Sequence, residues 1–427
     1  MGVLGDGIAA LACAHYLIRE GLRPVVLSPS AIGGWMAERF PVGPRRLDCF
    51  HVPVRRSDTA LCGLLADLDL LHRVVWREAH LGLYAADAQR YVQSPRDLWS
   101  LTSSSWTSRL RSSLLPLLGR GPRARGAAPG IGTLASDGPA GCDHFDVFHG
   151  WHHRKLRESG CPLCGTRPLG LPTRGVLREL AASRPRAYGY LRGGHRALMD
   201  ALAFSIVARG GQLRRGHRLQ AIEADARGAS VEWDSESERF DALISTVPLG
   251  QLAKLARGPL VRSLPFPEGP PHAEISVVAL ARGPVDLPYL TLPFGGSARF
   301  QRVYNAARLL PEEERGGLHP VYLVRDAETH AQDFQASDAK LIDEARELLG
   351  QLGPGLGHGD IEDLRVFRTG ETDLTWARAQ LDRPPRRRIE DAPLYLCTAA
   401  RPYARTRSAD TSVMLARDTV SQLAYQI

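Results

Sequence analysis

The chain begins MGVLGDGIAALACAHYLIREGLRPVVLSPSAIGG (residues 1–34), and we base the fold assignment on this stretch. Two short apolar runs, residues 3–4 and 24–27, flank a segment whose apolar residues recur at helical spacing. The bend after the first run contains Gly5 and Gly7, which permit a sharp turn because they lack a Cβ. The order strand, glycine turn, helix and strand predicts a βαβ unit at the start of the chain.

The glycine turn is typical of dinucleotide binding. In the pattern G-x-G-x-x-[G/A] the glycines let the backbone approach a pyrophosphate, and the next helix directs its positive N-terminus at the charge. Gly5, Gly7 and Ala10 occupy the three positions, and the pair Gly33-Gly34 follows the second strand. Ser28 stands where an acidic residue usually binds a ribose hydroxyl. The alternative is a glycine-rich turn in an ordinary α/β core.

Composition restricts the class of protein. The 427 residues are 44% hydrophobic and 23% charged, which is typical of a globular protein of two or three core-forming units. The net charge of +8 comes mainly from dispersed arginines, so we expect no nucleic-acid partner. No apolar run approaches the roughly 20 residues of a membrane span. Because the chain opens in a strand, we expect no export signal and a cytoplasmic location.

A group of histidines and cysteines lies within residues 142–165. His149 with His152, and Cys161 with Cys164, form two closely spaced donor pairs of the kind that binds tetrahedral zinc. Two alternatives are unligated residues and a redox dithiol. The chain has seven cysteines, and their odd number, without an export signal, argues against a disulfide framework.

Four later blocks support a family assignment. Together with the opening turn, the chain resembles the superfamily of flavin-containing amine oxidases, protoporphyrinogen oxidases and phytoene desaturases. The blocks that carry the resemblance are residues 48–70, 187–202, 218–225 with 240–248, and 394–420. The resemblance implies an FAD cofactor and an α/β fold, in which a Rossmann-like FAD-binding domain adjoins a second α+β substrate domain built on a mixed β-sheet.

The resemblance also implies a domain division and a set of FAD contacts. The FAD-binding domain would comprise residues 1–75, 188–262 and 390–427, and the substrate domain residues 76–187 and 263–389. The expected FAD contacts are Gly5, Gly7, Ile8, Ala9, Ala10, Ser28, Gly33, Gly34, Trp35, Leu219, Thr246, Thr398, Asp410, Ser412 and Val413. Two departures weaken the match: Ser28 replaces an acid, and Thr398 replaces part of a Gly-acid pair, with Asp410 as the nearest carboxylate.

The candidate catalytic residues are those that the resemblance places near the flavin ring. His51 is a candidate acid or base. Tyr403 lies in the C-terminal block, and Arg302 and Tyr304 share one face of a predicted strand. His51 could instead be a loop or packing histidine, and Arg302 with Tyr304 an ordinary surface pair.

The resemblance implies an FAD-dependent oxidoreductase that oxidises or desaturates a C–N or C–C bond of a small, biosynthetic substrate. One alternative is a non-redox flavoenzyme resembling UDP-galactopyranose mutase. The other is a partner protein that kept the fold and lost FAD, which the altered Ser28 position favours. The sequence identifies neither the substrate nor the electron acceptor, and it carries no signal for an oligomeric state or a partner protein.

Overall fold

A computed structural model shows the fold. It describes residues 1–86, 89–92, 186–216, 218–234, 236–264, 271–294, 299–328, 332–357, 359–374, 388–389, 392–398 and 409–425. The candidate zinc ligands His149, His152, Cys161 and Cys164 lie outside the described residues, as does Tyr403.

The predicted βαβ unit is confirmed, and it forms the centre of a five-stranded parallel sheet. Helix α1 (Ile8–Arg19) connects two strands that pair in parallel. The sheet has the order β10-β2-β1-β14-β20, so the N-terminal strand is its middle strand. Its strands are β1 (Gly2–Leu4), β2 (Val25–Ser28), β10 (Gln212–Arg215), β14 (Leu243–Ser245) and β20 (Leu394–Leu396).

Successive side chains along each strand point to opposite faces of the parallel sheet, and both faces are covered by other elements. In β1, Val3 packs into the helical side of the sheet, whereas the next residue, Leu4, packs into the opposite core. Four helices cover the first face: α1, α2 (Thr59–Asp67), α8 (Gly194–Ala208) and α13 (Ala409–Ala424). The antiparallel strands β11 (Leu219–Asp225), β12 (Gly228–Trp233) and β13 (Glu236–Phe240) cover the other face, with α9 (Leu249–Leu255) and α10 (Leu260–Ser263).

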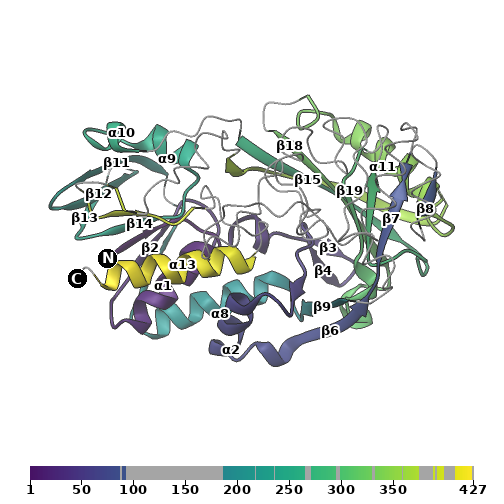
Figure 1. Ribbon diagram of the computed structural model, residues 1–427, viewed down its shortest axis with the longest axis horizontal. Coiled ribbons are helices and arrows are strands. Elements are labelled where there is room, and N and C mark those ends of the chain that lie inside the picture. The colour runs from purple at the N-terminus through teal and green to yellow at the C-terminus, as the bar shows by residue number, and fades with distance from the viewer. Residues whose placement is uncertain are drawn as a thin grey trace, which may run out of the picture.

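A seven-stranded mixed sheet forms the other half of the molecule, at the right of Figure 1. Its order is β19-β15-β18-β17-β16-β7-β8. The strands are β7 (Leu81–Ala85), β8 (Arg90–Val92), β15 (Pro271–Ala281), β16 (Leu290–Phe294), β17 (Arg302–Asn305), β18 (His319–Glu328) and β19 (Ile361–Leu374). All neighbours pair antiparallel except β7 with β16.

Helix α11 (Asp338–Leu352) covers one face of the mixed sheet. Its apolar residues recur at helical spacing, and Ser337 accepts a hydrogen bond from the N–H of Lys340 as an N-cap. Strand β15 again alternates: Val277 faces the α11 core, and Val278 faces a core shared with residues 40–50. That second core lies between the mixed sheet and the hairpin described next.

Short elements connect the two sheets. Strands β3 (Arg39–Val42) and β4 (Arg45–Asp48) form a hairpin, and β9 pairs with both β5 and β6. The remaining elements are β5 (Val54–Arg55), β6 (Val74–Ala79), β9 (Arg186–Leu191), η1 (Gly34–Ala37), η2 (Leu71–Arg73), η4 (Ala306–Arg308) and η5 (Glu312–Glu314). Both chain ends lie in the half that contains the parallel sheet (Figure 1).

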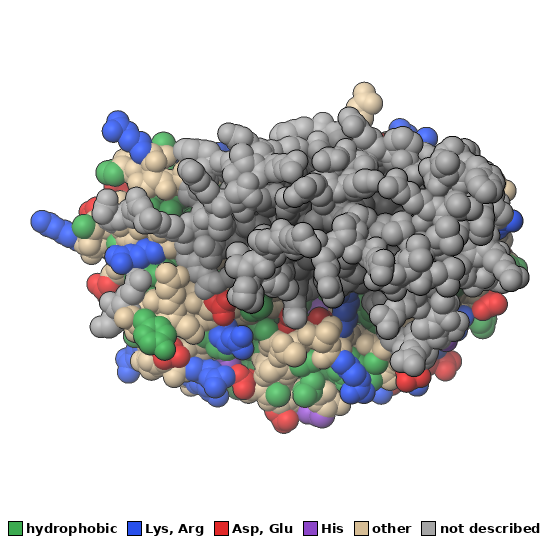
Figure 2. Space-filling model, viewed as in Figure 1, with side chains coloured by type: hydrophobic (Ala, Val, Ile, Leu, Met, Phe, Trp, Pro, Cys, Tyr) green, Lys and Arg blue, Asp and Glu red, His purple; other side chains and the backbone are tan. Residues whose placement is uncertain are grey.

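Charges are interspersed on the visible described surface. In Figure 2, arginine and lysine side chains alternate with carboxylates over the described part of that face. The excess of arginine in the sequence is therefore not gathered into a single basic patch on the described part of this view. None of the helices in the described ranges is long and apolar enough to cross a bilayer.

The junction of β4 and α8 generates a stability prediction. Gly194 has φ of +67°, and a Cβ there would lie 2.5 Å from Oδ2 of the buried Asp48 carboxylate. Gly210 has a similar φ of +86° but open space around the Cβ position. We expect Gly210→Ala to lower the free energy of unfolding by about 1 kcal/mol, because the backbone is strained. Gly194→Ala should lower it by at least about 2 kcal/mol more, because its Cβ collides with the Asp48 carboxylate.

Urea unfolding of both variants measures the difference. Equal unfolding midpoints for Gly194→Ala and Gly210→Ala would show that Asp48 does not fix the start of α8.

Candidate functional site

A cavity of about 570 Å³ lies between the two sheets. The glycine turn after β1, the loop after β2 and the start of α13 form one part of its wall. Strands β15, β17, β18 and β19 of the mixed sheet form another part. The cavity is therefore bounded by the predicted dinucleotide site and by polar side chains far away in sequence.

The glycine turn has the geometry that close approach of a phosphate requires. Gly5 has φ of +135°, and a Cβ there would collide with Oγ1 of Thr246, whose hydroxyl donates to the carbonyl of Leu4 at 3.0 Å. Gly7 has an ordinary φ of −80°, lines the cavity, and would have no protein atom within 4 Å of an added Cβ. The two glycines thus have different roles: Gly5 allows close packing against Thr246, and Gly7 leaves space open in the cavity.

The N-terminus of α1 faces this open space without a side-chain cap. Gly7 is the N-cap residue, and the first turn of the helix contains no acidic residue. The first N–H groups of a helix need partners, and an anion is a favourable one. The residues present therefore fit the pyrophosphate of a dinucleotide.

The second glycine pair closes the other side of the turn. The N–H of Gly33 donates to the main-chain carbonyl of Asp6 at 2.7 Å. Gly33 has φ of +103°, and a Cβ there would collide with Ala37 and Met199. Trp35 follows on η1 and lines the cavity. The loop after β2 is therefore tied directly to the loop after β1.

Three charged residues form a cluster on the mixed-sheet wall. Arg302 on β17 donates to Glu274 on β15 at 3.1 Å and to Asp326 on β18 at 2.7 Å. Glu274 and Asp326 are direct partners in the register of the two strands, where like charges repel. The guanidinium of Arg302 offsets that repulsion, because it contacts both carboxylates and its side chain is only 7% exposed.

His51 lies in a cage of tyrosine rings beside this cluster. Its Nε2 is 2.8 Å from the hydroxyl of Tyr289, and its ring is 5.2 Å from the rings of both Tyr304 and Tyr322. Burial lowers the pKa of His51 to about 3, with a smaller contribution in the same direction from His195. The imidazole is therefore neutral over the physiological range and a weak base.

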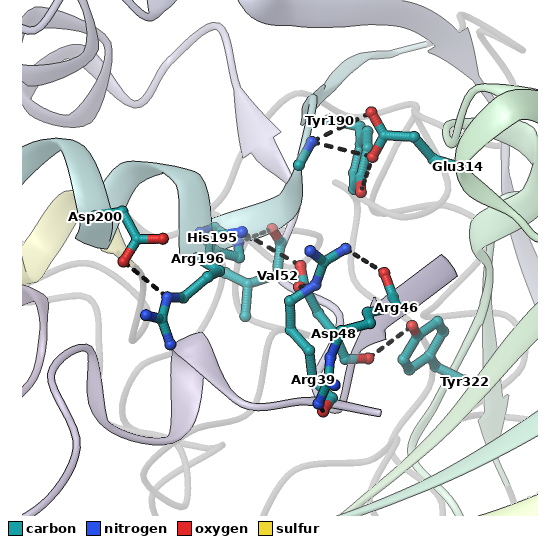
Figure 3. Close-up of polar contacts among 11 residues, drawn as sticks. Arg39, Arg46, Asp48, Val52, Tyr190, His195, Arg196, Asp200, Glu314 and Tyr322 are labelled. Atoms are coloured by element: carbon teal, nitrogen blue, oxygen red, sulfur yellow. Dashed lines mark hydrogen bonds and ion pairs between the residues drawn. The ribbon is translucent and has the colours of Figure 1, made fainter. Parts of the chain in front are cut away.

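A buried polar network fixes the segment that carries His51 (Figure 3). The Asp48 carboxylate lies 3.1 Å from Nε of Arg39 and accepts the N–H of His195 at 3.3 Å. Nε2 of His195 is 2.7 Å from the carbonyl of Val52, and the hydroxyl of Tyr322 donates to the carbonyl of Asp48 at 2.8 Å. Burial raises the pKa of Asp48, whereas His195 and Arg39 oppose the rise.

A second group of contacts in Figure 3 ties the start of α8 to η5. Glu314 accepts the hydroxyl of Tyr190 at 2.8 Å and the N–H of Gly193 at 3.0 Å. Burial, together with the nearby carboxylates, raises the pKa of Tyr190, so its phenol stays protonated and donates. The N-cap of α8 is thereby joined to η5, which precedes β18 of the mixed sheet.

The structure brings together many of the residues expected from the sequence. The cavity is lined by Gly5, Gly7, Ile8, Ala9, Gly33, Gly34, Trp35, His51, Thr246, Arg302, Tyr304 and Ser412. Six expected contacts are not among its lining residues: Ala10, Ser28, Leu219, Thr398, Asp410 and Val413. Their contact with a cofactor stays a prediction.

Asp410 and Val413, two residues of α13 among these six, have structural roles. The carboxylate of Asp410 is buried and accepts the N–H of Leu61 at 2.9 Å, in the first turn of α2. Val413 is fully buried in the helical core. Asp410 therefore joins α13 to α2 in this structure.

Sequence reasoning missed several cavity residues. Asp6, Glu274 and Asp326 all line the cavity. A signal was present for the last two, because Glu274 interrupts the apolar run AEISVVAL and Asp326 ends VYLVRD. A charge inside a buried strand usually requires a partner or a function. That the two carboxylates face each other across β15 and β18 was not readable without the pairing.

Comparisons with known proteins agree with this geometry. The family model of flavin-containing amine oxidoreductases matches residues 8–375. No curated protein is significantly similar to the chain in sequence.

Solved structures of similar fold cover nearly the whole chain. A protein from Exiguobacterium sp. 255-15 assigned as a protoporphyrinogen oxidase superposes with a TM-score of 0.69 at 15% identity, over 100% of this chain and 98% of that one. Putrescine oxidase bound to putrescine gives 0.62 at 16%, over 99% and 98%. Cyclohexylamine oxidase from Brevibacterium oxydans IH-35A gives 0.64 at 14%, over 100% and 98%. At these identities the likeness shows the fold.

No metal site accompanies the cavity within the described ranges. There, no group of three His, Cys, Asp or Glu residues is placed to hold a metal ion. The zinc hypothesis concerns residues outside those ranges, so it stays a prediction.

The low pKa of His51 generates a prediction for stability. In the unfolded chain the pKa of His51 returns to about 6.5. Between pH 6.5 and pH 3 the unfolded chain therefore binds a proton at His51 that the folded chain does not bind. The stabilisation is present above pH 6.5 and is lost as the pH falls toward 3. Because the ring borders the cavity, we expect roughly 1 to 2 kcal/mol of loss between pH 7 and pH 5, which His51→Gln removes.

The measurement is urea unfolding of both proteins at the two pH values. His72→Gln, at an exposed histidine of η2, controls for the loss of one histidine. If the stability of the wild type and of His51→Gln depends equally on pH, His51 is not a buried, neutral imidazole.

Proposed function

Because the chain belongs to the flavin-containing amine oxidoreductase family, we propose that it oxidises a C–N bond of a small amine, or desaturates a C–C bond, in the cavity between its two sheets. The protein is an FAD-dependent oxidoreductase. The observation that carries the proposal is the cavity itself, whose wall includes both the dinucleotide turn and the cluster of Arg302. An amine is the first choice because the family and two similar structures are named for amine oxidation.

In this proposal, different parts of the chain would bind FAD and the substrate. Gly5, Gly7 and the first turn of α1 would hold the pyrophosphate of FAD, and Gly33-Gly34 would border it. Bound FAD supplies a two-electron acceptor for the hydride that leaves the substrate carbon. In this proposal residues 1–75, 188–262 and 390–427 form the FAD-binding domain, and residues 76–187 and 263–389 form the substrate domain.

The mixed-sheet wall would orient the substrate. Arg302 is held by Glu274 and Asp326, so its guanidinium is fixed and little entropy is lost when it contacts a polar substrate group. The rings of Tyr304 and His51 add an apolar, water-excluding surface. His51, with a pKa of about 3, would act as a neutral hydrogen-bonding group rather than as a strong base.

The identity of the oxidised bond is tested with the purified full chain. We expect a yellow protein with a flavin absorption band. Anaerobic addition of amines such as putrescine and cyclohexylamine should bleach the band as the amine loses a hydride and a proton to become an imine. Oxygen should then restore the colour.

Other results of this experiment would favour the alternative reactions. Bleaching only by compounds with an oxidisable C–C bond would favour desaturation. Turnover that appears only after dithionite reduction would favour the non-redox mutase reaction. A colourless protein that FAD does not stabilise would overturn the proposal.

The role of Gly7 gives a second prediction. Gly7→Ala adds a methyl group to open space, without backbone strain, at the position that the pyrophosphate would approach. We expect at least about a tenfold loss of FAD affinity with little change in the stability of the flavin-free protein. Fluorescence titration of FAD and thermal unfolding of the flavin-free chain measure both.

Gly63→Ala is the matched control. Gly63 lies in α2, away from the cavity, and it too has no atom within 4 Å of an added Cβ. Unchanged FAD affinity in Gly7→Ala would show that the cofactor does not approach this turn.

A further inference from the structure

The end of β2 lacks the carboxylate that usually binds a ribose. Ser28 occupies that position, is 2% exposed, and donates its hydroxyl to the carbonyl of Ser30 at 2.7 Å. It is not among the residues that line the cavity. The Ser28 hydroxyl therefore already has an acceptor within the loop and does not reach the space where a cofactor would lie.

A different carboxylate lies beside this loop. Asp6, between Gly5 and Gly7, lines the cavity, and its Oδ2 accepts the hydroxyl of Ser30. Its Oδ1 would lie 3.2 Å from a Cβ added to Gly34. The side chain of Asp6 thus links the loop after β1 to the loop after β2 at the border of the cavity.

Helix capping does not account for this carboxylate. Gly7 is the N-cap of α1 and no side chain caps the helix, so Asp6 does not serve the first turn. A negative charge this close to a pyrophosphate site is unfavourable unless it accepts hydrogen bonds from the ligand. Among the hydrogen-bond donors of a dinucleotide, the ribose hydroxyls lie beside the end of the second strand.

We propose that Asp6 supplies the carboxylate that binds the ribose hydroxyls of the adenosine half of FAD, in place of the acid missing at Ser28. Ser30 holds the Asp6 side chain toward the loop after β2 while leaving Oδ1 able to accept. The inference rests on the proposed function, because it assumes that FAD binds at the glycine turn. It differs from the usual pattern in the strand from which the acid comes.

The test compares two adenine nucleotides on the flavin-free full chain. ADP carries both ribose hydroxyls, and 2′,3′-dideoxy-ADP carries neither. Calorimetric titration of the wild type should show ADP binding about tenfold or more tightly, because a hydrogen bond to a charged group is involved. Asp6→Ala should bind the two nucleotides with nearly equal affinity, and Asp6→Asn should fall between.

Controls separate a binding role from a structural one. Asp200→Ala removes an exposed carboxylate on α8 that pairs only with Arg196 among the contacts of Figure 3, and it should keep the wild-type preference. If Asp6 serves only to hold Ser30, Asp6→Ala weakens both nucleotides equally and the preference for ADP survives, which overturns the inference. If Ser28→Ala, rather than Asp6→Ala, loses the preference for ADP, Ser28 at the end of β2 binds the ribose. That result also overturns the inference.

Three further outcomes are informative. Tighter binding of both nucleotides by Asp6→Ala would mean that the carboxylate repels the pyrophosphate, against the inference. A wild type that binds FAD but shows no preference between the nucleotides would refute the role of Asp6 alone. A wild type that binds neither FAD nor ADP would refute the proposed function, so the two failures are distinguishable.

Discussion

The parallel pairing of β1 between β2 and β14 is the constraint on which the site depends. Three strands end at one edge of the sheet, so the turn after β1, the loop after β2 and Thr246 after β14 must meet there. Only a residue without a Cβ fits at Gly5, because Thr246 already fills that space. The open position at Gly7 and the uncapped start of α1 follow from the same arrangement.

The second half of the site depends on burial rather than on backbone geometry. His51 stays neutral because it is enclosed by tyrosine rings, and those rings come from strands β17 and β18 of the mixed sheet and from the segment before β16. The network around Asp48 holds the segment between β4 and β5 against α8. A buried network of this kind is costly when a partner is lost, so it fixes the cavity wall firmly.

The altered strand end at Ser28 is compatible with cofactor binding. The structure shows the Ser28 hydroxyl satisfied inside its own loop, with Asp6 directed at the neighbouring space. Loss of the usual acid at one strand and presence of an unusual acid in the adjoining turn are therefore parts of one local arrangement. How the ribose of FAD is held, as distinct from whether FAD binds, therefore becomes a question about the side chain of Asp6.

The sequence by itself determined the βαβ start and the flavoprotein resemblance, because hydrophobic periodicity and glycine positions are local properties. It also placed Gly5, Gly7, His51, Arg302 and Tyr304 among the site residues. Only the tertiary structure decided that Glu274 and Asp326 share Arg302, that tyrosines enclose His51, and that Asp6 reaches Ser30. These contacts depend on strand register and on the meeting of distant loops, which no local pattern in a single sequence specifies.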